Sequence, residues 1–318
     1  MLTNALTTFT FAFGITAPIF VVLFLGTLLK KRSVIDDSFI KSASSLVFNI
    51  GLPVMLFTTS ASADFSHIAD TNVLIAFTVM TLLVFAGSLL TAHWFTREPR
   101  DHGVIIQGAF RGNLVILGLA FCANAYGERG LAIATLPVAM TVVLYNALSI
   151  YVLNRSLQRS GNSFTATLNG IIKNPLMLAI AAGLLFNASG LKMPSIFLQS
   201  GKYLSQMVLP LALICIGGAL DLSQLKRIDA ATLSASVWKL ILSPLLACGM
   251  AIGLGVRGEN LAILFVLAAC PSATVSFVMV QAMKGNALLA ANIVVQTTLW
   301  SLLTVTLGLW LLELFNFI

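Results

Sequence analysis

Long apolar runs recur along the whole chain and are separated by short polar gaps. Each run has about 20 residues, the length at which an α-helix crosses the roughly 30 Å hydrocarbon core of a bilayer. A helix also bonds its own backbone groups, as lipid requires. The pattern predicts an all-α protein with ten transmembrane helices, at about residues 9–29, 39–61, 71–95, 104–124, 130–153, 171–188, 195–220, 230–254, 260–283 and 287–312.

The composition agrees with a polytopic membrane protein. Hydrophobic residues make up 58% of the 318 residues and charged residues only 9%, whereas soluble chains carry about 25% charged residues. The net charge of +7 is not gathered into the single basic patch typical of nucleic-acid binding. We therefore expect the lipid bilayer as a partner and no nucleic acid.

The basic residues predict the orientation of the chain, because Lys and Arg favour cytoplasmic loops. If both termini are outside, the inner loops hold twelve of them: Lys30, Lys31, Arg32, Lys41, Arg97, Arg100, Arg155, Arg159, Lys173, Lys226, Arg227 and Lys284. The outer loops then hold four: Arg129, Lys192, Lys202 and Arg257. We predict periplasmic N- and C-termini.

An internal repeat divides the chain. The polar segment 154–170 is predicted to be a cytoplasmic linker between a first half, 1–153, and a second half, 171–318, with five spans each. Since five is odd, the second half enters the membrane upside down, as an inverted-topology repeat. A shift of 157 residues aligns Pro18 with Pro175, Gly26 with Gly183, and Pro53 with Pro210.

Two runs contain residues that interrupt a helix. Gly112 and Gly118 lie in the fourth run, and glycine adopts dihedrals closed to other residues. Pro271 removes a backbone donor from the ninth run. The 157-residue shift places Asn113 opposite Cys270, next to Pro271. We predict that helices 4 and 9 are broken at equivalent positions and that the breaks face each other at mid-membrane.

Arg111 is the first candidate for a site residue. A charge at the bilayer centre costs about 2.5–3.5 kcal/mol or more, so Arg111 should face protein or a water-filled cavity. Its guanidinium can bind a carboxylate through two parallel hydrogen bonds. The alternatives are a structural tie to backbone carbonyls and a side chain that extends to the inner surface.

Polar side chains in other spans are further candidates. The Asn113 amide can bond freed backbone groups or a ligand. Ser272 and Thr274 can bond groups freed by Pro271 or contact substrate. Asn49 and Asn146 are candidate substrate contacts, or they form hydrogen bonds between helices.

Two ionisable residues are candidates for coupling. Lys239 lies deep in the eighth run, where a structural or coupling role competes with extension of its side chain to the surface. Asp70, at an outer helix start, is read as an N-cap first and a proton carrier second. We found no HExxH motif, nucleophile elbow, Walker loop or metal-ligand spacing in the sequence, so we expect neither an enzyme nor a bound metal.

Four segments resemble the auxin efflux carrier family, in particular its bacterial members described as malate or malonate permeases. They are NIGLPVMLF at 49–57, GNLVILG at 112–118, VVLYN at 142–146 and PSATVSFVMVQAMK at 271–284. The likeness covers the whole chain. It marks Asn113 and Asn146 as matches to amides that contact substrate in plant members.

The resemblance implies a five-plus-five inverted fold shared with bile acid sodium symporters, in which a transport domain moves against a scaffold of the first, second, sixth and seventh spans. It also implies a homodimer in the bacterial inner membrane. An Asp and Lys pair is expected early in the third span; Asp70 is present, and Leu74 stands where the Lys would be.

The resulting prediction is a secondary active transporter of small organic anions, with dicarboxylates such as malonate or malate first. It would work by alternating access of the elevator type, without a cofactor and with proton or sodium coupling. The alternatives are a sodium-coupled carrier of sterol-like or other organic anions with the same fold, and a channel.

Overall fold

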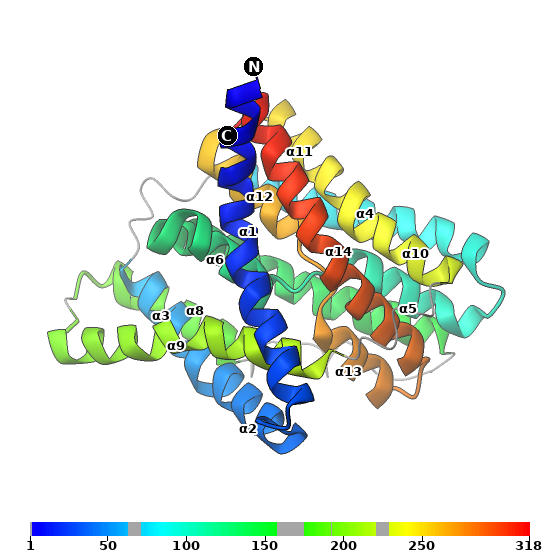
Figure 1. Ribbon diagram of the computed structural model, residues 1–318, viewed down its shortest axis with the longest axis horizontal. Coiled ribbons are helices and arrows are strands. Elements are labelled where there is room, and N and C mark those ends of the chain that lie inside the picture. The colour runs from blue at the N-terminus through cyan, green and yellow to red at the C-terminus, as the bar shows by residue number, and fades with distance from the viewer. Residues whose placement is uncertain (1, 63–70, 158–174, 192, 221–228) are drawn as a thin grey trace.

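The computed structural model describes residues 2–62, 71–157, 175–191, 193–220 and 229–318. Within these ranges the regular elements are helices (Figure 1). They are α1 (Leu2–Lys31), α2 (Asp37–Leu46), η1 (Val47–Gly51), α3 (Leu52–Ser62), α4 (Thr71–Phe95), α5 (Pro99–Phe110), η2 (Leu114–Gly118), α6 (Leu119–Ser156), α8 (Pro175–Ala188), α9 (Ser195–Ala219), α10 (Ala230–Val237), η4 (Trp238–Leu242), α11 (Ser243–Gly253), α12 (Gly258–Ala269), α13 (Thr274–Ala282) and α14 (Ala287–Leu314).

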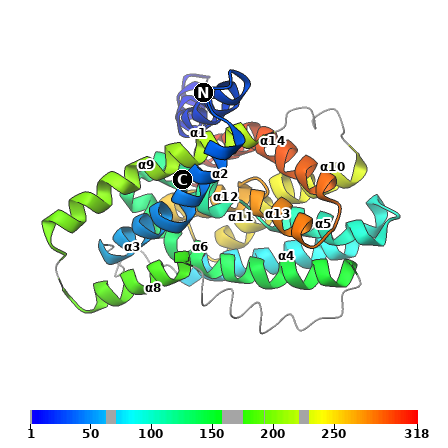
Figure 2. The same ribbon diagram turned by 90° about the horizontal axis from the view of Figure 1, so that it is seen from below.

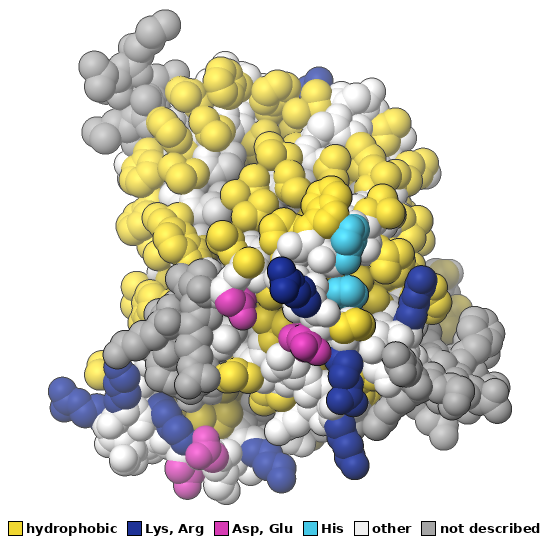
Figure 3. Space-filling view, turned by 90° about the vertical axis from the view of Figure 1, so that its right-hand side faces the viewer, with side chains coloured by type: hydrophobic (Ala, Val, Ile, Leu, Met, Phe, Trp, Pro, Cys, Tyr) yellow, Lys and Arg dark blue, Asp and Glu magenta, His cyan; other side chains and the backbone are white. Residues whose placement is uncertain are grey.

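The helices have the length and surface of membrane spans. In the described ranges, seven helical segments are long and apolar enough to cross a bilayer. Large hydrophobic side chains are exposed, including Trp94 at 70% and Leu185 at 71%, and apolar side chains cover much of the face in Figure 3 while Lys and Arg gather toward one end. The prediction of an all-helical polytopic membrane protein is confirmed.

Helix α6 is two helices joined by a sharp turn. The apolar segment Leu114–Ser156 has 43 residues, which as one straight helix would measure about 65 Å, twice the thickness of the hydrocarbon core. Its backbone leaves helical geometry at Tyr126 and at Gly127, where φ is 58° and ψ is −141°. The chain therefore reverses here, as the close approach of Gly130 to the Cys122 oxygen also shows. The leg after the turn is long enough to cross a membrane by itself, whereas the leg before it, Leu114–Tyr126, is shorter and continues the path of α5 beyond residues 111–113.

The Gly127→Ala substitution tests this turn. A Cβ at Gly127 would meet no atom within 4 Å, so the cost comes from a backbone conformation that is essentially restricted to glycine, about 1–3 kcal/mol. We expect a lower thermal unfolding midpoint in detergent. Gly14→Ala, in helix α1 and equally free of neighbours, is the matched control. Equal midpoints for the two variants would contradict this account of the turn.

Close contacts between glycines and neighbouring helices fix two helix pairs. A Cβ on Gly26 of α1 would lie 2.2 Å from the Ile214 carbonyl oxygen of α9, and one on Gly217 of α9 would lie 1.7 Å from the Leu23 oxygen of α1. Helices α3 and α8 approach in the same way, because a Cβ on Gly183 would lie 2.7 Å from the Phe57 oxygen. Small residues permit this backbone approach in membranes.

The helices form two groups that flank α6. Figure 2 shows α3, α8 and α9 together on one side and α4, α5 and α10 on the other. Both chain ends lie at the same end of the molecule, where α1 and α14 run side by side (Figure 1). Most of the predicted linker, residues 158–170, lies outside the described ranges.

Candidate functional site

Two helix interruptions meet in the interior. Helix α5 ends at Phe110 and η2 begins at Leu114, while α12 ends at Ala269 and α13 begins at Thr274. The intervening segments, Arg111–Asn113 and Cys270–Ala273, pair in antiparallel fashion. The Asn113 N–H donates to the Pro271 oxygen at 2.7 Å, and the Ala273 N–H donates to the Arg111 oxygen at 3.0 Å. We call this pair of segments the crossing.

Hydroxyl groups satisfy backbone groups that the interruptions leave free. The Ser272 hydroxyl donates to the Gly108 oxygen at 2.6 Å, near the end of α5. The Ser272 N–H donates to Thr297 Oγ1 of α14 at 3.0 Å. Unpaired backbone groups are costly in a membrane interior, so Ser272 and Thr297 stabilise the crossing.

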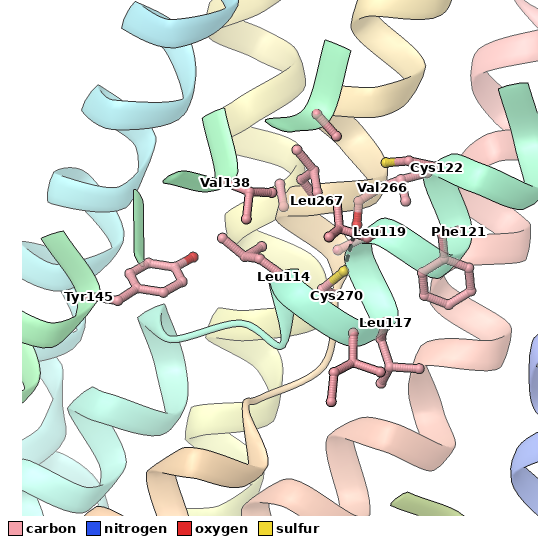
Figure 4. Close-up of a cluster of buried hydrophobic side chains, with 14 of the residues drawn as sticks. Leu114, Leu117, Leu119, Phe121, Cys122, Val138, Tyr145, Val266, Leu267 and Cys270 are labelled. Atoms are coloured by element: carbon pink, nitrogen blue, oxygen red, sulfur yellow. Dashed lines mark hydrogen bonds between the residues drawn. The ribbon is translucent and has the colours of Figure 1, made fainter. Parts of the chain in front are cut away.

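An apolar layer surrounds the crossing on one side. Leu114, Leu117 and Cys270 are buried, and Figure 4 shows them beside the point where the two chain segments pass each other. Gly118 is the last residue of η2, and the helix continues through it into α6. A Cβ there would lie 3.2 Å from Cys270 Sγ, so glycine lets the two interrupted helices pack closely.

Arg111 is buried at the crossing, with 6% of its surface exposed. One terminal nitrogen donates to Asn146 Oδ1 at 2.8 Å and the other to Ser149 Oγ at 3.0 Å. Its Nε has no partner among the described residues. The guanidinium is thus held by neutral side chains of α6, and its charge is not balanced by them.

The neighbouring Asn113 is also incompletely bonded. Its backbone participates in the crossing, and its carbonyl oxygen accepts from the Gly118 N–H at 3.0 Å. The buried side-chain Nδ2 has no acceptor within the described part of the chain. An amide donor without a partner is expensive to bury, so Asn113 has capacity for a ligand oxygen.

Lys239 brings a second positive charge to the crossing. It lies in η4 with 0% of its surface exposed, and the described residues provide no acceptor for its Nζ. A Cβ on Gly112 would lie 3.0 Å from this Nζ. The Lys239 side chain therefore reaches the crossing from η4, which lies between α10 and α11 in the chain, and the missing side chain of Gly112 leaves room for it.

The described residues place no acid beside either cation. Their ion pairs join Lys30 to Asp37, Arg129 to Glu259 and Lys202 to Glu128, at 2.6, 2.6 and 3.6 Å. Each of these pairs includes at least one exposed side chain. The crossing is thus a buried region with two basic groups and unused N–H donors.

A separate cavity of about 780 Å³ lies between α1, α3, α6 and α9. Its walls are largely apolar and include Pro18, Met55 and Pro210, while Glu128, Arg129 and Lys202 also border it. Ala120 and Ala123 line it from α6, the helix that continues from the crossing. The six predicted substrate contacts do not line this cavity.

The predicted site residues separate into two sets. Arg111, Asn113 and Ser272 lie at the crossing, where Asn146 contacts Arg111. Thr274 is half-buried and begins α13, directly after the crossing. In contrast, Asn49 is exposed in η1, and its Nδ2 donates to Ser45 Oγ at 3.0 Å. Asp70 lies outside the described residues.

Sequence reasoning missed two contributors to the crossing. Ser149 is three residues after Asn146 and so lies on the same face of a helix, which could have marked it as a second partner for Arg111. Thr297 has no comparable signal in the sequence. Its contact with Ser272 depends on how α14 packs against α12 and α13.

Broken helices that meet inside an all-helical membrane protein are typical of secondary transporters. A sequence profile of the membrane transport protein family matches residues 11–166 and 161–309. The chain belongs to this family, which is the auxin efflux carrier family that its motifs resemble.

Individual relatives extend over nearly the whole chain. An uncharacterized transporter of Methanothermobacter thermautotrophicus is 27% identical, with 92% of this chain and 95% of the relative covered. The uncharacterized transporter YfdV of Escherichia coli K12 is 27% identical, with 92% and 97% covered. A Rhizobium meliloti protein named "Putative malonate transporter" is 26% identical, with 94% and 95% covered.

Proposed function

We propose that the protein is a secondary active transporter of small organic anions, with dicarboxylates such as malonate or malate as the first candidates. The observation that carries the proposal is the pair of buried cations at the crossing, Arg111 and Lys239, for which the described residues provide no acid. Arg111 and Asn113 would bind a carboxylate. The name of the Rhizobium meliloti relative supports malonate.

The proposed architecture is ten spans in two inverted halves. Its support is that repeat-related residues make corresponding contacts. Gly26 of α1 packs against α9, and Gly183 of α8, 157 positions later, packs against α3. The first and seventh spans thus pair in the same way as the sixth and second. The two interruptions of the crossing have the same spacing, as Asn113 aligns with Cys270.

Transport would follow alternating access of the elevator type. Helices α1, α2, α3, α8 and α9 would form the scaffold, in which backbones touch at glycines. The remaining helices would carry the crossing. The cavity between α1, α3, α9 and α6 lies along the boundary between these two groups and would provide one route of access.

The cellular setting is proposed from the charge distribution and the family. The protein would lie in a bacterial inner membrane as a homodimer. Both termini would be periplasmic, because Lys and Arg are concentrated in the loops that this orientation places in the cytoplasm. Proton or sodium gradients would drive transport without a cofactor.

Uptake of radiolabelled malonate and malate into proteoliposomes tests the proposal. We expect saturable uptake that a proton or sodium gradient accelerates. Asn113→Ala should reduce uptake at low substrate concentration by at least about tenfold, since losing a hydrogen bond to a charged ligand costs about 1.5–3 kcal/mol.

The exposed Asn49→Ala variant is the matched control and should transport normally, because its amide bonds to Ser45 away from the crossing. No uptake of either acid by the wild-type protein would refute the proposed substrates. Flux that rises without saturation would favour a channel.

A further inference from the structure

Lys239 is the fully buried basic residue of η4, and it has no role in the hydrogen bonds that build the crossing. The described helices packed against η4 are α4, α5, α10, α11, α12 and α14. Apart from Arg111 and Cys270 at the crossing and Cys248 in α11, their ionisable side chains lie in the first or last turns: His93, Arg100, Asp101, His102, Glu259 and Glu313. No described carboxylate is therefore at the depth of Lys239.

The position of Nζ relates Lys239 to the proposed substrate site. It approaches the Cβ position of Gly112 to 3.0 Å, and Gly112 is flanked by Arg111 and Asn113. Each flanking residue has a buried nitrogen without a partner, Arg111 Nε and Asn113 Nδ2. Two donors of the crossing segment Arg111–Asn113 and one donor from η4 thus lie close to the same peptide segment.

We propose that the Lys239 ammonium group binds the second carboxylate of a dianionic substrate, while Arg111 and Asn113 bind the first. This inference rests on the proposed function and narrows its substrate class to dicarboxylates. A monocarboxylate would balance one of the two buried charges and leave the other uncompensated. A dicarboxylate balances both, and its two ends match two cations that approach from different helices.

The test compares two ligands of nearly equal shape, malonate and its monomethyl ester, which carries one charge fewer. Their affinities are measured by titration calorimetry on the protein in lipid nanodiscs. The wild-type protein should bind malonate more tightly. Lys239→Met should weaken malonate binding at least about tenfold and change ester binding by less than about threefold. The reason is that only malonate has the second carboxylate that Lys239 would bind.

The same substitution at exposed Lys41 of α2 is the matched control and should preserve both affinities. Lys239→Arg, which keeps the charge, should retain a preference for malonate. The unliganded Lys239→Met protein should unfold at a temperature no lower than that of the wild type, because the variant removes a buried charge without a partner.

Several results would overturn the inference. One is a Lys239→Met protein that prefers malonate over the ester as strongly as the wild type does. Another is an equal loss of affinity for both ligands. A third is a lower unfolding temperature of Lys239→Met, which would show that Lys239 has a structural partner. A wild-type protein that binds and transports neither acid would instead refute the proposed function. Malonate uptake by the wild type together with an unchanged Lys239→Met variant would refute the Lys239 assignment alone.

Discussion

Replacing Arg111 by methionine is expected to abolish malonate uptake. The guanidinium is the cation fixed in place by two side chains, Asn146 and Ser149, so it is already oriented before a carboxylate arrives. Removing one member of a buried charge pair costs about 3–5 kcal/mol, which corresponds to a loss of roughly a hundredfold or more in affinity. Initial uptake rates in proteoliposomes measure the effect.

Arg111→Lys separates charge from geometry. A lysine retains the positive charge but lacks the planar group that reaches Asn146 and Ser149 together, so intermediate uptake is expected. Size-exclusion chromatography must show that both variants remain folded. Methionine at this position with wild-type uptake would mean that Arg111 has no part in substrate binding.

Replacing Gly217 by valine should have the largest effect on folding. The added Cβ would lie 1.7 Å from the Leu23 oxygen, so α1 and α9 must separate. The hydrogen bond from Thr27 Oγ1 to the Gly217 oxygen, 2.8 Å long, would be strained as well. Overpacking typically costs about 1–3 kcal/mol and more where backbone is displaced. We expect loss of the monodisperse protein peak after purification.

Gly249→Val is the matched control for this substitution. Gly249 lies within α11, and a Cβ there would meet no atom within 4 Å. Replacing an exposed helical glycine removes its entropic cost, so this variant should unfold at or above the wild-type temperature. A Gly217→Val protein with the same stability as Gly249→Val would contradict the close packing of α1 and α9.

The class of fold could be predicted because it depends on local properties. Run length and apolar composition determine which segments can cross a membrane as helices, and the sequence displays both directly. The helix interruptions at Gly112 and Pro271 could be predicted for the same reason. A missing side chain or a missing backbone N–H changes the conformation at the residue itself, so the effect can be inferred from the sequence.

The environment of the candidate site could not be predicted in the same way, because it depends on which faces meet. Asn49 and Asn146 look equivalent in the sequence, as single amides in apolar runs. The structure leaves Asn49 exposed beside Ser45 and places Asn146 against Arg111. Likewise, 127 sequence positions separate Gly112 from Lys239, and only tertiary packing brings the lysine Nζ to the glycine.

The two hydrogen bonds of the crossing have a mechanical consequence. They join the ends of α5 and α12 to the starts of η2 and α13, in a region where freed N–H and C=O groups would find little water. A motion that pulls the two segments apart therefore costs more than one that moves all four helical pieces as a rigid unit. Donors mounted on such a unit keep their spacing during the motion, so a bound anion would travel with its binding groups.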